Sequence, residues 1–291
     1  MIYSLGAGER LVAVTHECDF PAEARAKPIA VRAALPLETM SSSEIDAAVS
    51  GQLASGASLY TVDENLIRDL QPDLIITQEL CQVCAPSGNE ISEALKQLSR
   101  PPRVLTLTPH SLDDVMQNVL EVGHAIGCRE EAEALVEIGR ERLEVVRQRT
   151  AALDRPRVFC MEWTNPIYCS GHWVPEMVEI AGGSDPLGRK GTDSVRIPWT
   201  EIVAHAPEIL IVMPCGYSLG DAVKRASHLF GLAGWHELPA VRSARVFAVD
   251  ANAYFARPGP RLVDGVELLA HLFHPKQFPW SGAKRAFARI A

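Results

Sequence analysis

The chain has 291 residues, of which 47% are hydrophobic and 22% charged, so it can bury cores for two domains of ordinary size. A formal charge of -8 and a pI near 5.6 provide no basic surface, which makes nucleic acid and anionic lipid poor partners. No apolar run approaches the ~20 residues of a membrane-spanning helix, and the opening MIYSLGAGER lacks the pattern of an export signal. These features predict a protein that does not span a membrane and is cytoplasmic, or periplasmic if the start of the chain is truncated.

Strand-like runs rich in β-branched and apolar residues recur along the chain, with helical patterns between most of them. This alternation predicts parallel sheets covered by helices, an α/β architecture. Capping-box spacing marks two helix starts, at Ser41 with Glu44 and at Ser111 with Asp114. The predicted strands are 11–15, 74–78, 103–107, 158–163, 209–213 and 246–250.

The stretch 112–153 carries two consecutive helical patterns, separated by Gly127 and Cys128, and no strand signal. Its second helix is mostly charged, with a few apolar residues that include Ile138. We interpret the pair as a helical brace between two lobes; the alternative is two packed surface helices within one domain. The predicted organisation is two Rossmann-like lobes with a ligand cleft between them: an N-terminal α/β lobe (1–111), a helical linker (112–153) and a C-terminal α/β lobe (154–291).

A faint internal repeat supports the two lobes. Segment 67–76, IRDLQPDLII, aligns with segment 202–211, IVAHAPEILI, so that Pro72 matches Pro207. Each copy has the pattern of a short helix, a proline that stops it, an acidic residue and a buried strand. One copy is common in α/β proteins, but two copies on either side of the long helices favour a duplicated lobe.

The residues that follow the predicted strands carry the candidate chemistry, because open parallel sheets bind ligands beyond the carboxyl ends of their strands. Three such segments begin with HECDFP, TNPIYC and PCGY, and the last strand leads into DANAYFARPGPR. The candidate ligand-binding residues in these segments are His16, Cys18, Asp19, Trp163, Tyr168, His172, Trp173, Cys215, Tyr254 and Arg257.

Thiols in these segments suggest a metal site as one interpretation. Cys81 and Cys84 have the CxxC spacing that lets two thiolates hold one ion, and His16 and Cys18 are the further candidate ligands for zinc or iron. With a single CxxC pair, an oxidisable dithiol and ordinary pocket lining or packing remain alternatives. Of the other cysteines, Cys160 and Cys128 are expected to pack in the core.

Aromatic residues crowd into or beside the same segments, although they make up only 6% of the chain. Flat rings suit a large planar ligand, and Arg196, Arg257 and Arg261 are available for carboxylate or phosphate groups. Trp235 lies away from the strand ends and is expected to be structural. The rings in question are Trp163, Tyr168, Trp173, Trp199, Tyr217, Tyr254 and Phe255.

Catalysis has little support in the sequence. The chain has no GxSxG elbow, no GxxxxGK[ST] phosphate loop, no HExxH helix and no convincing GxGxxG turn. A Cys–His nucleophile pair would depend on spatial arrangement alone. We therefore predict that the protein is not an enzyme.

Several segments resemble a known family, the helix-hinged substrate-binding proteins of the cobalamin and iron-siderophore ABC transporters. The resemblance spans nearly the whole chain, and HECD, TQELCQVC and NAYFARPGPR look most like a branch labelled cobalamin-binding protein. Members usually begin with a strand before the helix that MIYSLGAGERLV resembles; either the start of this chain is truncated or its first lobe differs. The other segments that carry it are LVAVTHECDFP, NLIRDLQPDLIITQ, GHWVPEMVEIAGG, WTEIVAHAPEILIV and DANAYFARPGPRLVDG.

The resemblance implies two α/β lobes bridged by a long helix, a small-molecule ligand held between them without chemical change, and an ABC permease as a possible partner. Carried over by position, it lines the cleft with the candidate ligand-binding residues above other than Asp19, together with Cys81 and Cys84. A corrinoid would offer a flat face to the rings and a cobalt to His or thiolate. Our hypothesis is therefore a binding protein for cobalamin or a related metal complex; the alternatives are a metal or thiol site on Cys18, Cys81 and Cys84, and, less favoured, an enzyme of unknown reaction.

Overall fold

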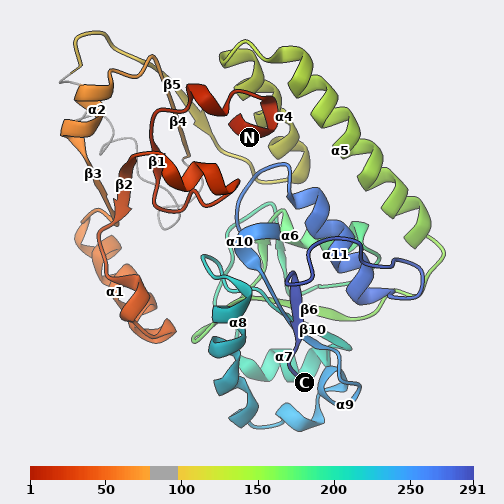
Figure 1. Ribbon diagram of the computed structural model, residues 1–291. Helices are drawn as coiled ribbons and strands as arrows, with labels where there is room; N and C mark the ends of the chain where they lie inside the picture. Colours follow the sequence, from red (N-terminus) through yellow and green to blue (C-terminus); the bar gives the residue numbers. More distant parts are fainter. Residues whose placement is uncertain (79–97) are drawn as a thin grey trace. The chain divides into compact units, whose positions relative to one another are not determined.

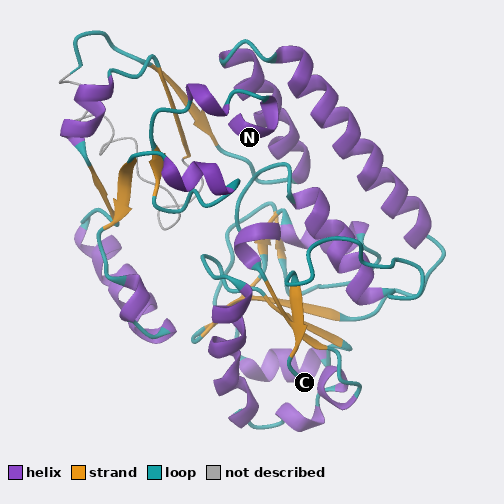
Figure 2. Ribbon diagram, viewed as in Figure 1, coloured by secondary structure: helices purple, strands orange, loops and turns teal. Residues whose placement is uncertain are grey.

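A computed structural model describes residues 1–78 and 98–291 of the chain (Figure 1). Contacts divide the protein into two units, and both contain helices and strands (Figure 2). The long helices α4 (Leu112–Ala125) and α5 (Arg129–Thr150) each contribute residues to both units. The first unit comprises Met1–Pro109 and Asn118–Glu133, and the second comprises His110–Gln117 and Ala134–Ala291.

The first unit contains a mixed sheet and a separate parallel pair of strands. In the mixed sheet β1 (Val14–Thr15) pairs in parallel with β2 (Ile29–Ala33), which pairs antiparallel with β3 (Tyr60–Val62). The parallel pair is β4 (Leu74–Gln78) with β5 (Arg103–Leu107). The helices described in this unit are α1 (Ser42–Ser55) and α2 (Glu64–Leu70), with short 3-10 turns at Ile2–Leu5, Gly8–Arg10, Ala22–Ala26 and Leu37–Thr39.

The second unit is built on one larger sheet in the order β12-β11-β10-β6-β7. Its centre is parallel: β10 (Ile209–Val212) lies between β6 (Val158–Thr164) and β11 (Val246–Val249). The outer strands β7 (Ile167–Cys169) and β12 (Phe287–Arg289) run antiparallel to their neighbours. The remaining elements are β8 (Gly171–His172), β9 (Arg189–Lys190), α6 (Val174–Ile180), α7 (Trp199–His205), α8 (Leu219–Ala226), α9 (Pro239–Arg242), α10 (Ala251–Tyr254), α11 (Leu262–Phe273), and 3-10 turns at Ser227–Gly231 and Trp235–Glu237.

Helices cover both faces of this sheet (Figure 1). On one face, alternate strand residues such as Phe159 and Leu210 pack against Ile202 of α7 and Ala240 of α9. On the other face Val158 lies beside Val178 and Phe273, which come from α6 and α11. All residues of β10 and β11 are buried, as expected for parallel strands covered on both sides.

The structure confirms the internal repeat, and the two copies share the same backbone conformation where their helices end. Helix α2 ends at Gln71 with φ 45° and ψ 57°, and helix α7 ends at Ala206 with φ 50° and ψ 61°. Both residues occupy the left-handed region and directly precede a proline, which disfavours the helical conformation for the residue before it. Strands β4 and β10 follow at the aligned positions. The same helix-stop-strand unit therefore occurs once in each unit of the protein.

The α/β class and the predicted strand positions are confirmed, with local corrections. Strand β1 is only two residues long, because the residues before it form 3-10 turns where the resemblance implied a helix. In α5, Ile138 is 54% exposed while Val136 is 3% exposed, so the buried stripe runs through Val136. Both capping boxes form, at Ser41 with Glu44 and at Ser111 with Asp114. The lobe boundaries at 111 and 153, and the ligand position between lobes, stay predictions.

None of the helices in residues 1–78 and 98–291 combines the length and the apolar character that crossing a membrane requires.

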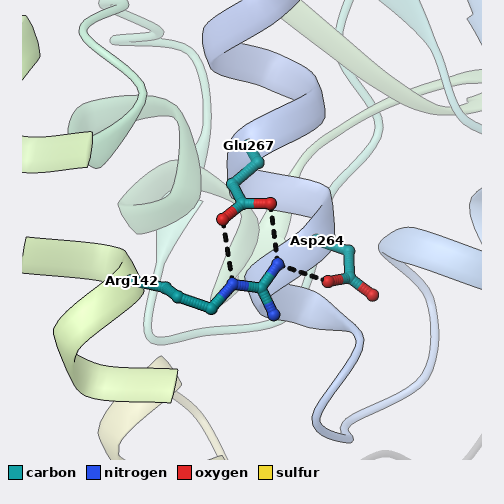
Figure 3. Close-up of polar contacts among 3 residues, drawn as sticks. All are labelled: Arg142, Asp264 and Glu267. Atoms are coloured by element: carbon teal, nitrogen blue, oxygen red, sulfur yellow. Dashed lines mark hydrogen bonds and ion pairs between the residues drawn. The ribbon is translucent and has the colours of Figure 1, made fainter. Parts of the chain in front are cut away.

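An arginine on α5 holds α11 by two carboxylates (Figure 3). Arg142 binds Glu267 through two hydrogen bonds, from Nε to Oε1 (2.9 Å) and from one terminal nitrogen to Oε2 (2.7 Å). The same nitrogen donates to Asp264 Oδ1 at 2.6 Å. Two-pronged pairing of this kind fixes direction as well as distance, so it sets the angle between α5 and α11.

We expect the Arg142→Gln variant to lose about 1 kcal/mol of unfolding free energy, because a partly buried, two-pronged pair is broken. The matched control is Arg129→Gln on the same helix, which removes one exposed pair with Glu133 (2.7 Å). That change is expected to cost less, because water and salt screen an exposed pair. Urea denaturation of both variants at low and high salt measures the difference. Equal losses would show that the Arg142 contacts add nothing beyond an ordinary surface pair.

The carboxylate of Asp185, in the second unit, makes the stability of the protein depend on pH. Asp185 Oδ2 accepts hydrogen bonds from the backbone N of Cys160 (3.0 Å) and from the hydroxyl of Ser170 (3.3 Å). Burial raises the pKa of Asp185 from 3.8 to about 6, although these hydrogen bonds oppose the shift. The folded protein therefore binds a proton at Asp185 more tightly than the unfolded chain does.

The proton bound at Asp185 contributes to the unfolding free energy fully below pH 3.8, and this contribution is lost as the pH rises through about 6. The Asp185→Asn variant cannot titrate, so its unfolding free energy relative to the wild type should rise between these values, by on the order of 1 to 3 kcal/mol. Asp114→Asn is the control of opposite sign, because the pKa of Asp114 is lowered in the folded protein. Burial acts to raise that pKa, but hydrogen bonds from His110 and Ser111 outweigh the effect of burial. The stability that Asp114 contributes is lost as the pH falls below 3.8, so chemical denaturation from below pH 3.8 to above pH 6 tests both variants. A constant difference for Asp185→Asn would contradict the assignment.

Candidate functional site

The carboxyl ends of the parallel strands β6, β10 and β11 meet at one edge of the second unit's sheet. Backbone hydrogen bonds hold the segments that follow β10 and β11: Cys215 N donates to the carbonyl of Glu162 in β6 (3.0 Å), and Asn252 N donates to the Tyr217 carbonyl (3.4 Å). Ligands of parallel sheets bind at such edges, where polar loops follow buried strands. The candidate functional site is this edge.

Three aromatic residues occupy neighbouring positions at the edge. The rings of Trp163 and Tyr217 have centroids 5.6 Å apart, and Trp163 faces Tyr168 directly across the β6–β7 pair. An arginine contacts each outer ring: the Arg225 guanidinium lies 4.2 Å from the Tyr217 centroid, and Arg196 Nε donates to the Tyr168 hydroxyl at 2.9 Å. We call this set the ring row; its members in spatial order are Arg225, Tyr217, Trp163, Tyr168 and Arg196.

The ring row is partly exposed, unlike the core beneath it. Trp163, Tyr168, Tyr217 and Arg225 are half-buried, and Arg196 is exposed. Burial raises the pKa of Tyr217, while the adjacent Arg225 acts to lower it. The row therefore presents apolar faces and guanidinium groups on an accessible surface.

Tyr254 adds a ring after β11. Its ring packs edge-on against Trp280 with centroids 6.0 Å apart, and burial raises its pKa. On its other side α11 approaches closely, since a Cβ at Gly265 would lie 2.2 Å from the Tyr254 carbonyl oxygen. Arg257 is half-buried in the turn between α10 and α11. Sequence reasoning missed Trp280, because no predicted strand ends near it.

Of the candidate rings, Trp173 is buried in the core, and Trp199 is half-buried and packs against the core. Trp173 is 3% exposed, and its indole NH donates to the Phe255 carbonyl at 2.8 Å; its assignment as a ligand contact stays a prediction. Trp199 stacks on the buried Trp235 at 6.1 Å and donates to the Ala233 carbonyl. Both indoles satisfy their NH groups within the protein, as buried tryptophans usually do.

His172 lies in a separate histidine pair. Its Nε2 is 3.0 Å from Asp193 Oδ1, and its ring stacks on His110 at 6.0 Å. Burial lowers the pKa of His172, and Asp193 opposes the shift. The side chain is 13% exposed, and its backbone occupies the left-handed region at φ 50°. His172 therefore has its own polar neighbours and is not a member of the ring row. Cys215, in contrast, lies exposed in the segment before Tyr217.

In the first unit, the candidates after β1 are held by local contacts. His16 Nδ1 lies 3.3 Å from the Val31 carbonyl, and Cys18 Sγ lies 3.6 Å from the Thr15 hydroxyl. The chain doubles back after β1, because Cys18 N donates to the Thr15 carbonyl. His16 and Cys18 therefore belong to one turn at the carboxyl end of the strand.

The neighbours of this turn were only partly predicted. The Asp19 carbonyl accepts a hydrogen bond from Arg25 Nε at 3.2 Å. Phe20 is 59% exposed, and the Tyr60 ring lies 6.4 Å from that of His16. Tyr60 belongs to β3, a strand that the sequence did not indicate, so its proximity to His16 depends on a pairing that only the structure shows.

The predicted metal site falls partly outside the described residues. Cys81 and Cys84 belong to segment 79–97, and the prediction that they bind metal with His16 and Cys18 stays a prediction. In residues 1–78 and 98–291 there is no group of three or more His, Cys, Asp and Glu side chains placed to hold a metal ion.

A hollow of about 530 Å³ elsewhere in the second unit is strongly polar. Its cations are engaged by the protein: Arg155 donates to the carbonyls of Glu179 (3.1 Å) and Gly183 (2.7 Å), and Lys190 pairs with the Glu179 carboxylate at 2.5 Å. These internal contacts tie α6 to the loop that follows it. The hollow therefore resembles a hydrated structural junction more than a ligand site.

Comparison with known proteins assigns the chain to a family. The model of the family described as "Periplasmic binding protein" matches residues 1–253. The chain belongs to the periplasmic binding protein family. This match covers most of both units.

Relatives in this family cover most of the chain at low identity. A vitamin B12-binding protein of Vibrio cholerae is 24% identical over 268 residues, 91% of this chain and 82% of its own length. An uncharacterized ABC transporter substrate-binding lipoprotein of Bacillus subtilis is 25% identical over 284 residues, 95% of this chain and 77% of its own. Among solved structures, a periplasmic heme binding protein from Pseudomonas aeruginosa matches with a TM-score of 0.72 at 20% identity, covering 96% of this chain and 90% of its own. At this identity the likeness supports the two-lobed fold and leaves the ligand open.

The contact between Gly265 and Tyr254 leads to a stability prediction. Replacing a helical glycine with alanine ordinarily gains about 0.5 to 1 kcal/mol. Here the new Cβ would meet the Tyr254 carbonyl, so we expect Gly265→Ala to lose about 2 kcal/mol or more. Gly51→Ala in α1 is the matched control, because Gly51 is also helical and a Cβ there meets nothing within 4 Å. Denaturant unfolding measures both changes, and a stabilised Gly265→Ala variant would show that α11 is free to move away from Tyr254.

Proposed function

We propose that this protein is the substrate-binding component of an ABC transporter and that it holds cobalamin or a related metal-containing tetrapyrrole. The observation that carries the proposal is the ring row at the carboxyl edge of the second unit's sheet. A tetrapyrrole offers a broad flat face to stacked rings, and it needs polar groups only around its rim. The order of the row, with rings in the middle and guanidinium groups at both ends, matches that requirement.

The family supports the transport part of the proposal, and two relatives support the ligand class. One relative is named for vitamin B12, and a structural neighbour is named for heme. Both ligands are large, flat and metal-containing. A binding role without catalysis agrees with the family and with the ring row, whose side chains are suited to contact and not to bond making.

The proposed partner is an ABC permease, as the name of the Bacillus subtilis relative suggests. Relatives are described as periplasmic proteins or lipoproteins, so we place this protein on the outer side of the cytoplasmic membrane. The cytoplasmic location expected from the opening residues gains no support from these relatives.

Titration with cyanocobalamin, hydroxocobalamin and haemin, followed by ligand absorption and protein fluorescence, tests the proposal. We expect at least one of the three to bind, and Trp163→Leu to weaken that binding roughly tenfold, about 1.4 kcal/mol. Trp199→Leu is the control, because Trp199 packs on Trp235 outside the ring row and its replacement should change affinity less than about twofold.

Failure of all three ligands to bind at high micromolar concentration would refute the tetrapyrrole proposal. Equal losses of affinity in Trp163→Leu and Trp199→Leu would show that the ring row is not the contact surface.

A further inference from the structure

His228 joins two backbone segments that belong to different parts of the ring row. Its Nδ1 lies 2.8 Å from the Arg225 carbonyl oxygen, in the last turn of α8, and its Nε2 lies 2.8 Å from the Thr164 carbonyl oxygen, at the end of β6. Trp163 precedes Thr164 in β6, and the Arg225 side chain packs over the Tyr217 ring. The Trp163 and Tyr217 rings in turn have centroids 5.6 Å apart. The imidazole therefore connects the backbones of two segments whose side chains also meet.

The two hydrogen bonds of His228 need two protons on its ring. A carbonyl oxygen only accepts, so each ring nitrogen has to donate. Neutral imidazole has one N–H group and one nitrogen lone pair, whereas the protonated ring has two N–H groups. In the neutral ring, a lone pair would face a carbonyl oxygen at 2.8 Å, and the two would repel each other. The geometry therefore fits the imidazolium ion and satisfies the neutral ring by half.

Both acceptors suit a cation. The Arg225 carbonyl is one of the last carbonyls of α8, where the helix dipole places partial negative charge. Thr164 is 1% exposed, so its carbonyl is shielded from water and loss of its hydrogen bond would be costly. His228 itself is exposed, so its ring exchanges protons readily with the solvent.

The charged side chains on the surrounding elements have contacts of their own. On α8, Asp221 lies 3.5 Å from Lys224, and on β6 the Glu162 carboxylate accepts a hydrogen bond from Gly171 N at 3.0 Å. Both ring nitrogens of His228 face backbone carbonyls, so backbone dipoles hold its proton. The charged or titratable groups on the elements around His228 and α8 are Asp221, Lys224 and Arg225 on α8, Tyr217 before it, Cys160 and Glu162 on β6, Tyr168 and Cys169 on β7, Arg289 on β12, and His236 and Glu237 in the turn Trp235–Glu237.

We infer that His228 is a positioning residue of the ring row: its protonated ring fixes Tyr217 against Trp163, and loss of the proton loosens this spacing. The inference rests on the proposed function and deepens it by making ligand affinity depend on pH. In the neutral ring the remaining N–H stays on the buried Thr164 carbonyl, because the Arg225 carbonyl at the helix end can bind water instead. Deprotonation therefore releases the end of α8 and the Tyr217 side of the row, while Trp163 keeps its place in the sheet.

The direction of the pH effect follows from this proton count. Histidine rings in general gain and lose their second proton between about pH 5 and 8. The row is fixed at the acid end of that range, so a flat ligand should bind more tightly at about pH 5.5 than at about pH 8. We expect a difference of roughly threefold to tenfold, which corresponds to one hydrogen bond.

Titration of the wild type and variants with cyanocobalamin and with haemin across this pH range measures the effect. Each variant is compared with the wild type at the same pH, so that titration of the probe itself cancels. His228→Gln has no charge and should lose roughly threefold to tenfold in affinity at the acid end, with less than about a twofold change at the basic end. His228→Arg keeps the charge and more than one donor at every pH, so it should recover part of the affinity at the basic end. His236→Gln, which replaces another exposed histidine in the adjacent turn, is the control and should follow the wild-type profile.

The nitrogen chemical shifts of ¹⁵N-labelled histidine report the state of the ring without a ligand, with the His228 signals assigned by their loss in His228→Gln. We expect the doubly protonated ring at the acid end and the form with its proton on Nε2 at the basic end. Thermal unfolding at both ends of the range checks that each variant is folded.

If His228→Gln keeps the wild-type pH profile of binding, or if the His228 ring is neutral at the acid end, the inference is overturned while the proposed function stands. If neither probe binds the wild type at any pH, the proposed function fails, and the positioning role fails with it whatever the state of the ring.

Discussion

Burial of β10 and β11 on both faces is the constraint on which the second unit depends. Every side chain of these strands is enclosed by helices, so polar and reactive groups are confined to the segments that begin where the strands end. Because β6 runs parallel to them, all these segments emerge at one edge. The hydrogen bonds from Cys215 to Glu162 and from Asn252 to Tyr217 then hold neighbouring segments at fixed spacing. The candidate site is a consequence of how the core is covered.

The ring row adds a second requirement, the register between strands. Trp163, Tyr168 and Arg196 project together only because each faces the next across a pair of backbones, and a slip of one residue would turn a whole segment to the opposite face. The pairing of β6 with β7 contains an irregularity between Met161 and Trp163. Local strand irregularities often re-aim a side chain, and here the residue that follows is the central ring of the row.

The sequence indicated the scaffold well, because the signals for it are local. Strands 74–78 and 103–107 have the predicted bounds, and the repeated proline pattern located equivalent strands in the two units. The site was less predictable. The sequence showed which aromatic residues lie near strand ends but not which way their side chains point. Trp173 and Trp199 therefore appeared as suitable for ligand contact as Trp163. Arg225, Tyr60 and Trp280 join their neighbours through non-local pairing or helix packing, for which periodicity contains no signal.

Helix α11 is held on two sides by contacts of different kinds. Arg142 binds it through Asp264 and Glu267, and these residues flank Gly265, whose backbone lies against the Tyr254 carbonyl. The position of α11 therefore depends both on the Arg142 ion pairs and on the close contact between Gly265 and Tyr254. A sequence change that shifted α5 along α11 would be transmitted to Tyr254 through hard contact, without any alteration to the residues that line the site. Under the proposed function, such a change would alter ligand affinity from a helix outside the ring row.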